Sequence, residues 1–387
     1  MILPAIRFPA RQTFLEPDST AAPPPAPTAR RIIRYYPRAL VGDGGITSSV
    51  GHQSRELVRA GAEVVIAYDA GEPPRSDDGV EWVRVRHAGW PWPVPQDLDG
   101  IIREADLLVL HSAWAFHNVR AGAIARQHQV PYLLEPRGAY DPAIVHRKRR
   151  RKKLWWRAWE RDLVQGARAI HVFFDSERAH LEALGYRGDV IVAPNGVEVP
   201  PDVHWDGGSG GYVLWMGRFD PEHKGIDLLL QALALLSPTE RPPLRLHGPD
   251  ARSEGKAAMR QLVGALDLDR WVTIGGPIHG AEKFDLLARA RGFVYPSRWE
   301  AFGNATAEAA ALGVPTLVTP HPLGRHLAGR GAAFLAEATP AALAAGLRDL
   351  LKPEAAAVGR RAAALVREEI TWPRVARSWL EQVEELL

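Results

Sequence analysis

Cysteine is absent from the 387 residues of the chain, and methionine occurs only three times. Without cysteine there can be no disulfide, no thiolate metal site and no cysteine nucleophile. Long apolar runs are missing too: none approaches the roughly 18–20 residues that span a bilayer. The start, MILPAIRFPARQ, is interrupted by Pro4, Arg7 and Pro9 before a secretory apolar region could form. We therefore expect a cytoplasmic protein that meets membranes, if at all, at the inner face of the plasma membrane.

The composition is that of an ordinary globular protein, but the charged residues are unevenly distributed along the chain. The chain is 46% hydrophobic and 24% charged. Between Arg147 and Arg161 there are nine basic residues and one acidic residue, Glu160, whereas residues 201–387 are close to neutral. A positive field this local indicates a local partner rather than general binding of polyanions.

Apolar strand-like runs alternate with helix-period segments along most of the chain. Residues 1–29 end in a Pro/Ala tract and are predicted to be a flexible lead-in. A Pro/Gly-rich stretch at 201–211 is a predicted linker between two halves. The predicted strands are RIIRYY, AEVVIAY, VEWVRV, DLLVLH, PYLLEP, RAIHVF and DVIVAPN before the linker, and YVLWMGR, LRLHGP, WVTIGGP, GFVYPS and PTLVTP after it. This alternation predicts an α/β fold with two parallel, helix-covered sheets and functional residues in the loops after the strands.

The segment MGRFDPEHKGIDLLLQAL, residues 216–233, carries two cations in a loop between a strand and a helix. Arg218 and Lys224 could neutralise a diphosphate by charge-assisted hydrogen bonds. A solvated turn in which the two cations pair with Asp220 or Glu222 fits the same letters equally well. From this segment alone, both interpretations stay open.

The segment YPSRWEAFGNATAEAAALGVP, residues 295–315, places two acids around a predicted helix start. Glu300 lies in the loop after a strand, Gly303 allows close backbone approach, and Asn304 is the expected N-cap. Glu308 lies about one turn into the helix. The free amides and positive dipole end at such a helix start suit a phosphate, and the two carboxylates can accept hydrogen bonds from sugar hydroxyls.

Together these two segments resemble the donor-binding signature of the retaining GT-B glycosyltransferases of family 4. The residues that carry the resemblance are Gly217-Arg218, Lys224-Gly225, Glu300 and Glu308, supported by GDGG at 42–45, APNGVEVP at 193–200 and TWPRVARSWLEQVEELL at 371–387. The resemblance implies two Rossmann-like domains facing across a cleft. Residues 30–200 would bind the acceptor and residues 212–365 the nucleotide sugar, and the end of the chain, 366–387, would cross back to the first domain.

The resemblance also implies a role for each matching residue. Arg218 and Lys224 would hold the donor diphosphate, and Glu300 would face the transferred sugar; these three are the expected catalytic residues. Glu308 would take the ribose hydroxyls. The complete expected donor site is Arg218, Lys224, Gly276, Pro277, Ile278, Glu300, Phe302, Gly303, Asn304, Glu308, Gly44 and Gly45.

On the acceptor side the chain departs from the family. Members often carry a histidine where EPRGAYDP, residues 135–142, has Arg137. An arginine cannot act as a base, but it can orient an acceptor or stabilise phosphate. His111, at the end of a predicted strand, is a second candidate, and Gly138 lies next to Arg137. These three residues are the expected acceptor side.

The implied activity is a retaining transfer of a hexose-type sugar from a UDP- or GDP-sugar to a hydroxyl acceptor, without metal or cofactor. The acceptor would be a sugar, a lipid-linked molecule or a small molecule, in cell-surface polysaccharide, glycolipid or glycoconjugate synthesis. Two alternatives are an epimerase-like nucleotide-sugar enzyme and a nucleic-acid-binding protein that uses the basic run 147–153. We expect no nucleic-acid partner, because no recognition motif accompanies that run.

The basic run leads directly into three tryptophans, in HRKRRRKKLWWRAW at 146–159. Clustered cations followed by aromatic residues suit an anionic membrane surface, so segment 147–159 is a predicted membrane contact. Trp155, Trp159 and Leu163 share one helical face, and that spacing fits core packing at least as well as membrane insertion.

Overall fold

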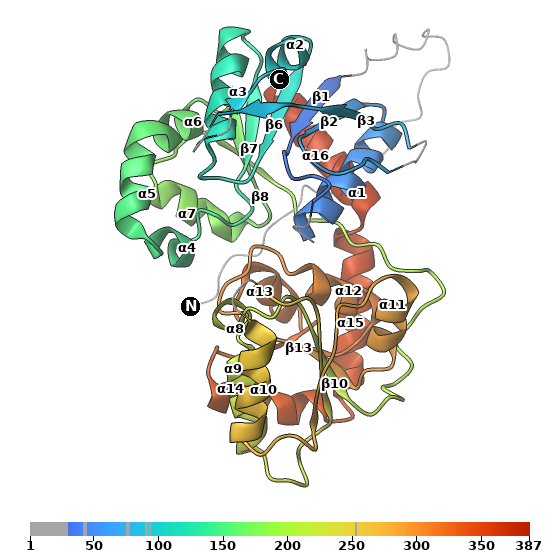
Figure 1. The fold of residues 1–387 in the computed structure, drawn as a ribbon. Coiled ribbons are helices and arrows are strands. Elements are labelled where there is room, and N and C mark those ends of the chain that lie inside the picture. Colours follow the sequence, from blue (N-terminus) through green and yellow to red (C-terminus); the bar gives the residue numbers. More distant parts are fainter. Residues whose placement is uncertain (1–29, 42–44, 75–77, 90–91, 93, 252–253) are drawn as a thin grey trace, which may run out of the picture.

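The structure, a computed structural model, describes residues 30–41, 45–74, 78–89, 92, 94–251 and 254–387. The predicted lead-in 1–29 and Gly44 lie outside the described residues. The chain forms two lobes, each built on a parallel sheet with helices packed against it (Figure 1).

The first lobe contains a seven-stranded parallel sheet in the order β3-β2-β1-β6-β7-β8-β9 and a short antiparallel β4-β5 pair. Its strands are β1 (Arg31–Tyr35), β2 (Glu63–Tyr68), β3 (Glu81–Arg84), β4 (His87–Ala88), β5 (Val94–Pro95), β6 (Leu107–His111), β7 (Tyr132–Glu135), β8 (Ala169–Val172) and β9 (Asp189–Val192). Its helices are α1 (Gly45–Arg59), α2 (Leu98–Arg103), α3 (Phe116–Gln127), α4 (Pro142–His146), α5 (Arg149–Trp155), a π-helical turn at Trp156–Glu160, α6 (Arg161–Gln165), a 3-10 turn at Asp175–Glu177 and α7 (Arg178–Ala183).

The second lobe repeats the plan with a six-stranded parallel sheet in the order β12-β11-β10-β13-β14-β15. Its strands are β10 (Val213–Met216), β11 (Leu244–His247), β12 (Val272–Ile274), β13 (Gly292–Tyr295), β14 (Thr316–Val318) and β15 (Phe334–Leu335). Its helices are α8 (Pro221–Lys224), α9 (Ile226–Leu235), α10 (Gly255–Ala265), α11 (Gly280–Ala288), α12 (Asn304–Leu312), α13 (Pro322–Ala328), α14 (Pro340–Leu350) and α15 (Ala355–Glu369).

The strands read as continuous apolar runs because parallel sheets are buried on both faces. Every residue of β6 and of β10 is buried, for example. All twelve runs that the sequence predicts as strands contain one in the structure, whereas β4, β5 and β15, each two residues long, are too short to leave a pattern.

In both sheets the order of the strands reverses beside the first strand of the lobe. The position of this reversal decides where a ligand can bind. In the second lobe β10 lies between β11 and β13, and in the first lobe β1 lies between β2 and β6. In doubly wound folds the crevice outside the carboxyl ends of the strands, at this reversal, is the binding position. The loops after β10 and β13 are therefore the first place to look for a site.

The last helix, α16 (Trp372–Leu386), returns to the first lobe (Figure 1). Its buried residues Val375, Trp379 and Val383 belong to the apolar core that also contains Leu57 of α1. The crossing is fixed by a hydrogen bond from the Val197 amide to the Ile370 carbonyl, 2.8 Å long. The predicted domain end at 365 therefore falls inside α15, and the chain leaves the second lobe at Ile370.

Candidate active site

The loops after β10 and β13 carry most of the residues that the sequence singles out. The first loop contains Arg218 and leads into the single turn α8, which ends at Lys224. The second loop contains Glu300 and leads into α12, which begins at Asn304. Since β10 and β13 are hydrogen-bonded neighbours, the two loops lie side by side at the reversal of the sheet.

Lys224 and Glu300 contact each other. The buried ammonium of Lys224 pairs with Oε2 of Glu300 and lies 2.9 Å from the hydroxyl of Tyr295. That hydroxyl donates to the same carboxylate oxygen, also at 2.9 Å. Two residues expected in the site thus contact each other directly, and both contact a third, Tyr295. Tyr295 was not expected there, because it ends an apolar run and reads as a strand residue.

This contact fixes the charge state of the pair. Burial alone would raise the pKa of Glu300, but the neighbouring Lys224 outweighs it and lowers that pKa to about 2. Burial likewise opposes the charge of Lys224, yet the Glu300 carboxylate raises its pKa above the ordinary value. The site therefore holds an ionised carboxylate and an ammonium near neutral pH, which can face a developing positive and a developing negative charge respectively.

Arg218 is exposed and, within the described part of the chain, has no side-chain hydrogen bond or ion pair. The alternative in which it pairs with Asp220 or Glu222 is not realised. Asp220 instead accepts from the amide of His223 at 3.2 Å, and Glu222 pairs with Arg147 of the first lobe at 2.8 Å. Arg218 is therefore a cation available to an anionic ligand.

Asn304 is the first residue of α12 rather than its N-cap, which corrects the expectation from the sequence. The cap position is taken by Gly303, whose φ of 93° is the left-handed conformation that glycine adopts without strain. The side chain of Asn304 is thereby free to turn towards the first lobe. The amides of Thr306 and Ala307 bond to the Gly303 carbonyl, whereas those of Asn304 and Ala305 have no partner among the described residues and could bind an anion.

Glu308 forms an ion pair on the second turn of α12. Its Oε1 accepts from Nζ of Lys283 on α11 at 2.8 Å. Burial raises the pKa of Glu308, and Lys283 acts against that effect. Lys283 was not expected in the site, because its segment has the pattern of an ordinary amphipathic helix.

The predicted base loop Gly276, Pro277 and Ile278 follows β12 at the same edge of the sheet. The Gly276 carbonyl accepts from the amide of Gly248 at 3.0 Å. A Cβ on Gly248 would lie 1.7 Å from the Gly217 carbonyl oxygen, so only glycine fits between these loops. The loops after β10, β11 and β12 therefore form one continuous rim.

The acceptor-side histidine and arginine point into the first lobe. His111 is fully buried, with Nδ1 2.8 Å from Oε2 of Glu135, and burial lowers its pKa to about 3. Arg137 pairs with the same carboxylate at 3.0 Å, and its side chain is 4% exposed. The reason is Glu135 itself, a buried strand-end carboxylate that requires polar partners. Gly138, by contrast, lies where the two lobes touch, against Ala301.

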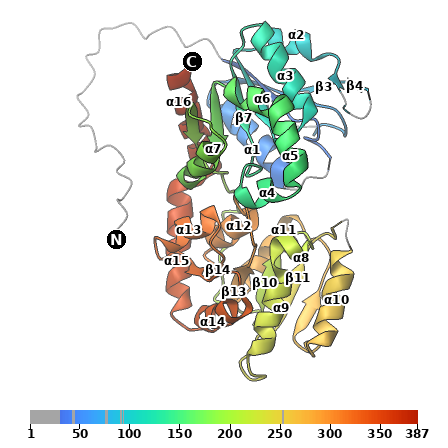
Figure 2. The ribbon, with the colours of Figure 1, turned by 90° about the vertical axis from the view of Figure 1, so that its left-hand side faces the viewer.

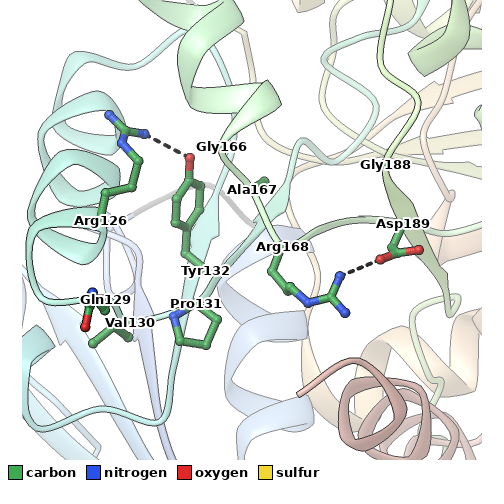
Figure 3. A pocket seen from close by; sticks show the side chains of 10 residues that line it. All are labelled: Arg126, Gln129, Val130, Pro131, Tyr132, Gly166, Ala167, Arg168, Gly188 and Asp189. Atoms are coloured by element: carbon green, nitrogen blue, oxygen red, sulfur yellow. Dashed lines mark hydrogen bonds and ion pairs between the residues drawn. The ribbon is translucent and has the colours of Figure 1, made fainter.

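A cavity of about 730 Å³ lies at the amino ends of strands of the first sheet, opposite to the carboxyl ends where the candidate site is expected (Figure 3). It is lined by the first residues of β7 and β9 and contains none of the expected site residues. Its charged groups are satisfied: Arg126 donates to the hydroxyl of Tyr132, and Arg168 pairs with Asp189. This cavity is therefore separate from the candidate site.

Comparison with known families gives two matches that together cover most of the chain. The family described as "Glycosyl transferases group 1" matches residues 210–353, and "Glycosyl transferase 4-like domain" matches residues 44–196. A similar protein is D-inositol 3-phosphate glycosyltransferase of Kineococcus radiotolerans, 29% identical over 87% of this chain and 89% of that protein.

Solved structures agree on the fold. Sucrose-phosphate synthase from Thermosynechococcus elongatus matches with a TM-score of 0.72 at 20% identity, over 92% of this chain and 99% of that one. Anabaena HepE matches with a TM-score of 0.73 at 15% identity, over 92% and 100%. The two family matches and the Kineococcus relative favour a transferase over the epimerase-like and nucleic-acid-binding alternatives. With the site at the reversal of its second sheet, the chain belongs to the group 1 glycosyltransferases of GT-B fold.

Proposed function

We propose that this glycosyltransferase moves a hexose-type sugar from a UDP- or GDP-sugar to a hydroxyl acceptor, with retention of configuration and without a metal ion. The product would be a cell-surface polysaccharide, a glycolipid or another glycoconjugate. The observation that carries the proposal is the group formed by Lys224, Tyr295 and Glu300, with the exposed Arg218 nearby and the start of α12 at its edge.

The chemistry follows from where charge develops. When the bond between the anomeric carbon and the diphosphate breaks, positive charge grows on the sugar and negative charge on phosphate. Arg218, Lys224 and the first amides of α12 would stabilise the leaving diphosphate, and the ionised Glu300 would face the sugar. The leaving phosphate would accept the acceptor proton on the same face, which retains configuration.

Names of similar proteins support the substrate class. Anabaena HepE was solved with UDP and glucose, and the Kineococcus relative is named for transfer to D-inositol 3-phosphate. For the present chain these names support a nucleotide-sugar donor and a hydroxyl-bearing acceptor. Glu308, held by Lys283, is the proposed partner of the ribose hydroxyls.

Slow donor hydrolysis tests the proposal directly. Purified protein should release nucleotide from at least one of UDP-glucose, UDP-galactose and GDP-mannose, and should do so equally with EDTA. Arg218→Ala should lower kcat by roughly 100-fold, whereas Arg270→Ala, an exposed arginine before β12, should not. Because free sugar mutarotates, retention is read from NMR of a glycoside formed with a hydroxyl acceptor, which should have the anomeric configuration of the donor. Absence of release from every donor, or loss of activity in EDTA, would contradict the proposal.

We propose further that the basic segment 147–159 contacts an anionic membrane surface, at the inner face of the plasma membrane. Arg149, Arg150 and Arg151 are exposed there, and Leu154 beside them is 70% exposed. Trp159 packs against Trp92, so part of the aromatic stripe is occupied by intramolecular contacts. Within the described residues, no helix is long and apolar enough to cross a bilayer.

Liposome co-sedimentation tests this contact. Binding should require anionic lipid and weaken with salt, because the attraction is electrostatic. Arg150→Glu combined with Leu154→Ser should abolish binding and leave donor hydrolysis intact. Equal sedimentation with neutral and anionic vesicles would remove the membrane proposal.

A further inference from the structure

The donor-side segment 301–304, between the two glutamates, is held largely by the first lobe. A Cβ on Gly138 would lie 2.6 Å from Cβ of Ala301, so the loops touch there. Phe302 is buried, with its ring centroid 5.7 Å from that of Phe173 and 6.0 Å from that of Phe174. Both of these phenylalanines follow β8. The backbone that leads into α12 is therefore packed by residues of the first lobe.

The polar part of this contact is Asn195, in the segment after β9. Asn195 is 7% exposed, and its Nδ2 donates to Oδ1 of Asn304 at 3.0 Å. Nδ2 of Asn304 donates in turn to the carbonyl of Gly45, the first residue of α1, at 3.3 Å. Asn304 thus joins the starts of α12 and α1, and Asn195 fixes the direction in which its amide points.

Asn195 is held in turn by a side chain of its own lobe, Arg137. Its Oδ1 accepts a long hydrogen bond from Arg137, 3.5 Å, and Arg137 is held by the buried Glu135. The position therefore needs an acceptor towards Arg137 and a donor towards Asn304. A carboxamide supplies both, whereas an aspartate of the same shape has no hydrogen to donate.

We propose that Asn195 is a positioning residue for donor binding. Through Asn304 it sets the orientation of the first turn of α12, whose amides receive the donor diphosphate; this part rests on the proposed function. Affinity for the donor is then determined partly by a first-lobe side chain that does not touch the donor. The same chain of contacts gives Arg137 a role as an anchor for Asn195.

The isosteric variant Asn195→Asp is the main test. It keeps the side-chain volume and removes the hydrogen that Asn304 accepts, so KM for the donor should rise roughly ten-fold, the usual scale for one lost buried hydrogen bond. In the absence of ligand, amide exchange at residues 303–307 should accelerate. Asn304→Ala should weaken UDP or GDP binding, measured by calorimetry, and Asn195→Ala should add little to it, because the two residues act as one unit.

Asn118→Asp is the matched control. Asn118 is fully buried in the first lobe and donates to the His111 carbonyl at 2.9 Å, without reaching the second lobe. It should lower the melting temperature at least as much as Asn195→Asp and leave donor KM and exchange at 303–307 unchanged.

Two results would overturn the inference. One is normal donor KM and normal exchange in Asn195→Asp; the other is strict additivity of the Asn195 and Asn304 variants. If the wild type binds neither UDP nor GDP, the proposed function fails and the inference fails with it. If wild-type binding is normal and Asn195→Asp has no effect, only the inference fails.

Discussion

Glu135 in the first lobe and Glu300 in the second are both largely removed from water near the carboxyl end of their sheets. Glu135 is the last residue of β7, and its side chain is 1% exposed. Glu300 lies in the loop after β13, and its side chain is 14% exposed. Both carry a depressed pKa, because cationic and polar neighbours overcome the effect of burial.

The two carboxylates differ in what surrounds them. Glu135 has Arg137 at 3.0 Å, Arg34 at 3.7 Å, and the rings of His111 and His171 at 2.8 Å, all from the first lobe. Glu300 is held by one lysine and one tyrosine, with the ring of His223 3.9 Å away, in the loop after β13. A carboxylate at the end of a buried strand is sealed into the fold, whereas one in the following loop stays within reach of a ligand.

The largest expected effect is on stability, from Glu135→Gln. It removes the negative charge at constant volume and leaves Arg34 and Arg137 buried without a counter-ion. Breaking a buried ion pair in this way costs about 3–5 kcal/mol. The melting temperature should fall by about 10 °C. Unchanged unfolding by calorimetry or in urea would show that the cluster is not a structural ion network.

Glu300→Gln should lower turnover strongly and stability only slightly, the reverse of what is expected for Glu135→Gln. It removes the charge that faces the donor sugar, so kcat should drop by roughly 100-fold. The free energy of unfolding should fall by about 1 kcal/mol, because Tyr295 and the partly accessible site can still solvate Lys224. Steady-state donor hydrolysis and denaturation on the same sample give both numbers. A large loss of stability with normal turnover would make Glu300 the equivalent of Glu135.

Acidification should destabilise both regions through their histidines. Burial lowers the native pKa of His111 to about 3, and that of His223 and His321 to about 4, so the unfolded chain takes up protons below about pH 6.5 that the native protein does not. Stability should therefore fall from pH 7 to pH 5, measured by urea unfolding at each pH.

Acidification also removes the stabilising contribution of Glu135, but in a lower pH range than for the histidines. Its native pKa is depressed, so its contribution to stability is complete above about pH 5 and is lost only below the unfolded value of about 4.3.

His111→Gln tests the contribution of the histidines. It should reduce the slope of unfolding free energy against pH between pH 7 and pH 5, because it removes one group that takes up a proton only on unfolding. An unchanged slope would mean that the pKa of His111 is the same in the native and the unfolded protein.

The smallest effect is expected from Arg147→Ala. Arg147 pairs with Glu222 across the lobes and stacks 5.1 Å from the ring of Trp299, the neighbour of Glu300 (Figure 2 shows α4 above α8). Both charged side chains are at least half exposed, so the pair contributes less than about 1 kcal/mol. Turnover should change by less than about three-fold, and Arg150→Ala should have no effect. A larger loss would show that the basic segment also positions the site.

Much of the fold could be predicted because local physics decides it. The apolar runs of β6 and β10 have the composition of strands buried on both faces, and their alternation with helical patterns implies parallel sheets. The positions of Arg218 and Lys224 followed in the same way, since both lie in the segment after β10, at the carboxyl end of the sheet. The same pattern placed Glu300 and Glu308 around the start of the following helix, and the family resemblance implied a role for each of these residues.

Other site features depended on contacts between distant residues. Arg137 and His111 were expected on the acceptor side, yet Glu135 draws both inward, because a buried carboxylate is stable only with partners. Asn304 was expected to cap its own helix, but Gly303 can take the left-handed cap and Asn195 holds the amide from the other lobe.

By itself, the sequence determined the two sheets, their order of elements and the residues that can carry charge in the loops. Each of these follows from short-range patterns of burial and backbone preference. Only the tertiary structure decided which of those charges are available. The availability of Arg218, the pairing of Lys224 with Glu300 and the inward turn of Arg137 depend on neighbours many residues away, whose burial and charge no local pattern records.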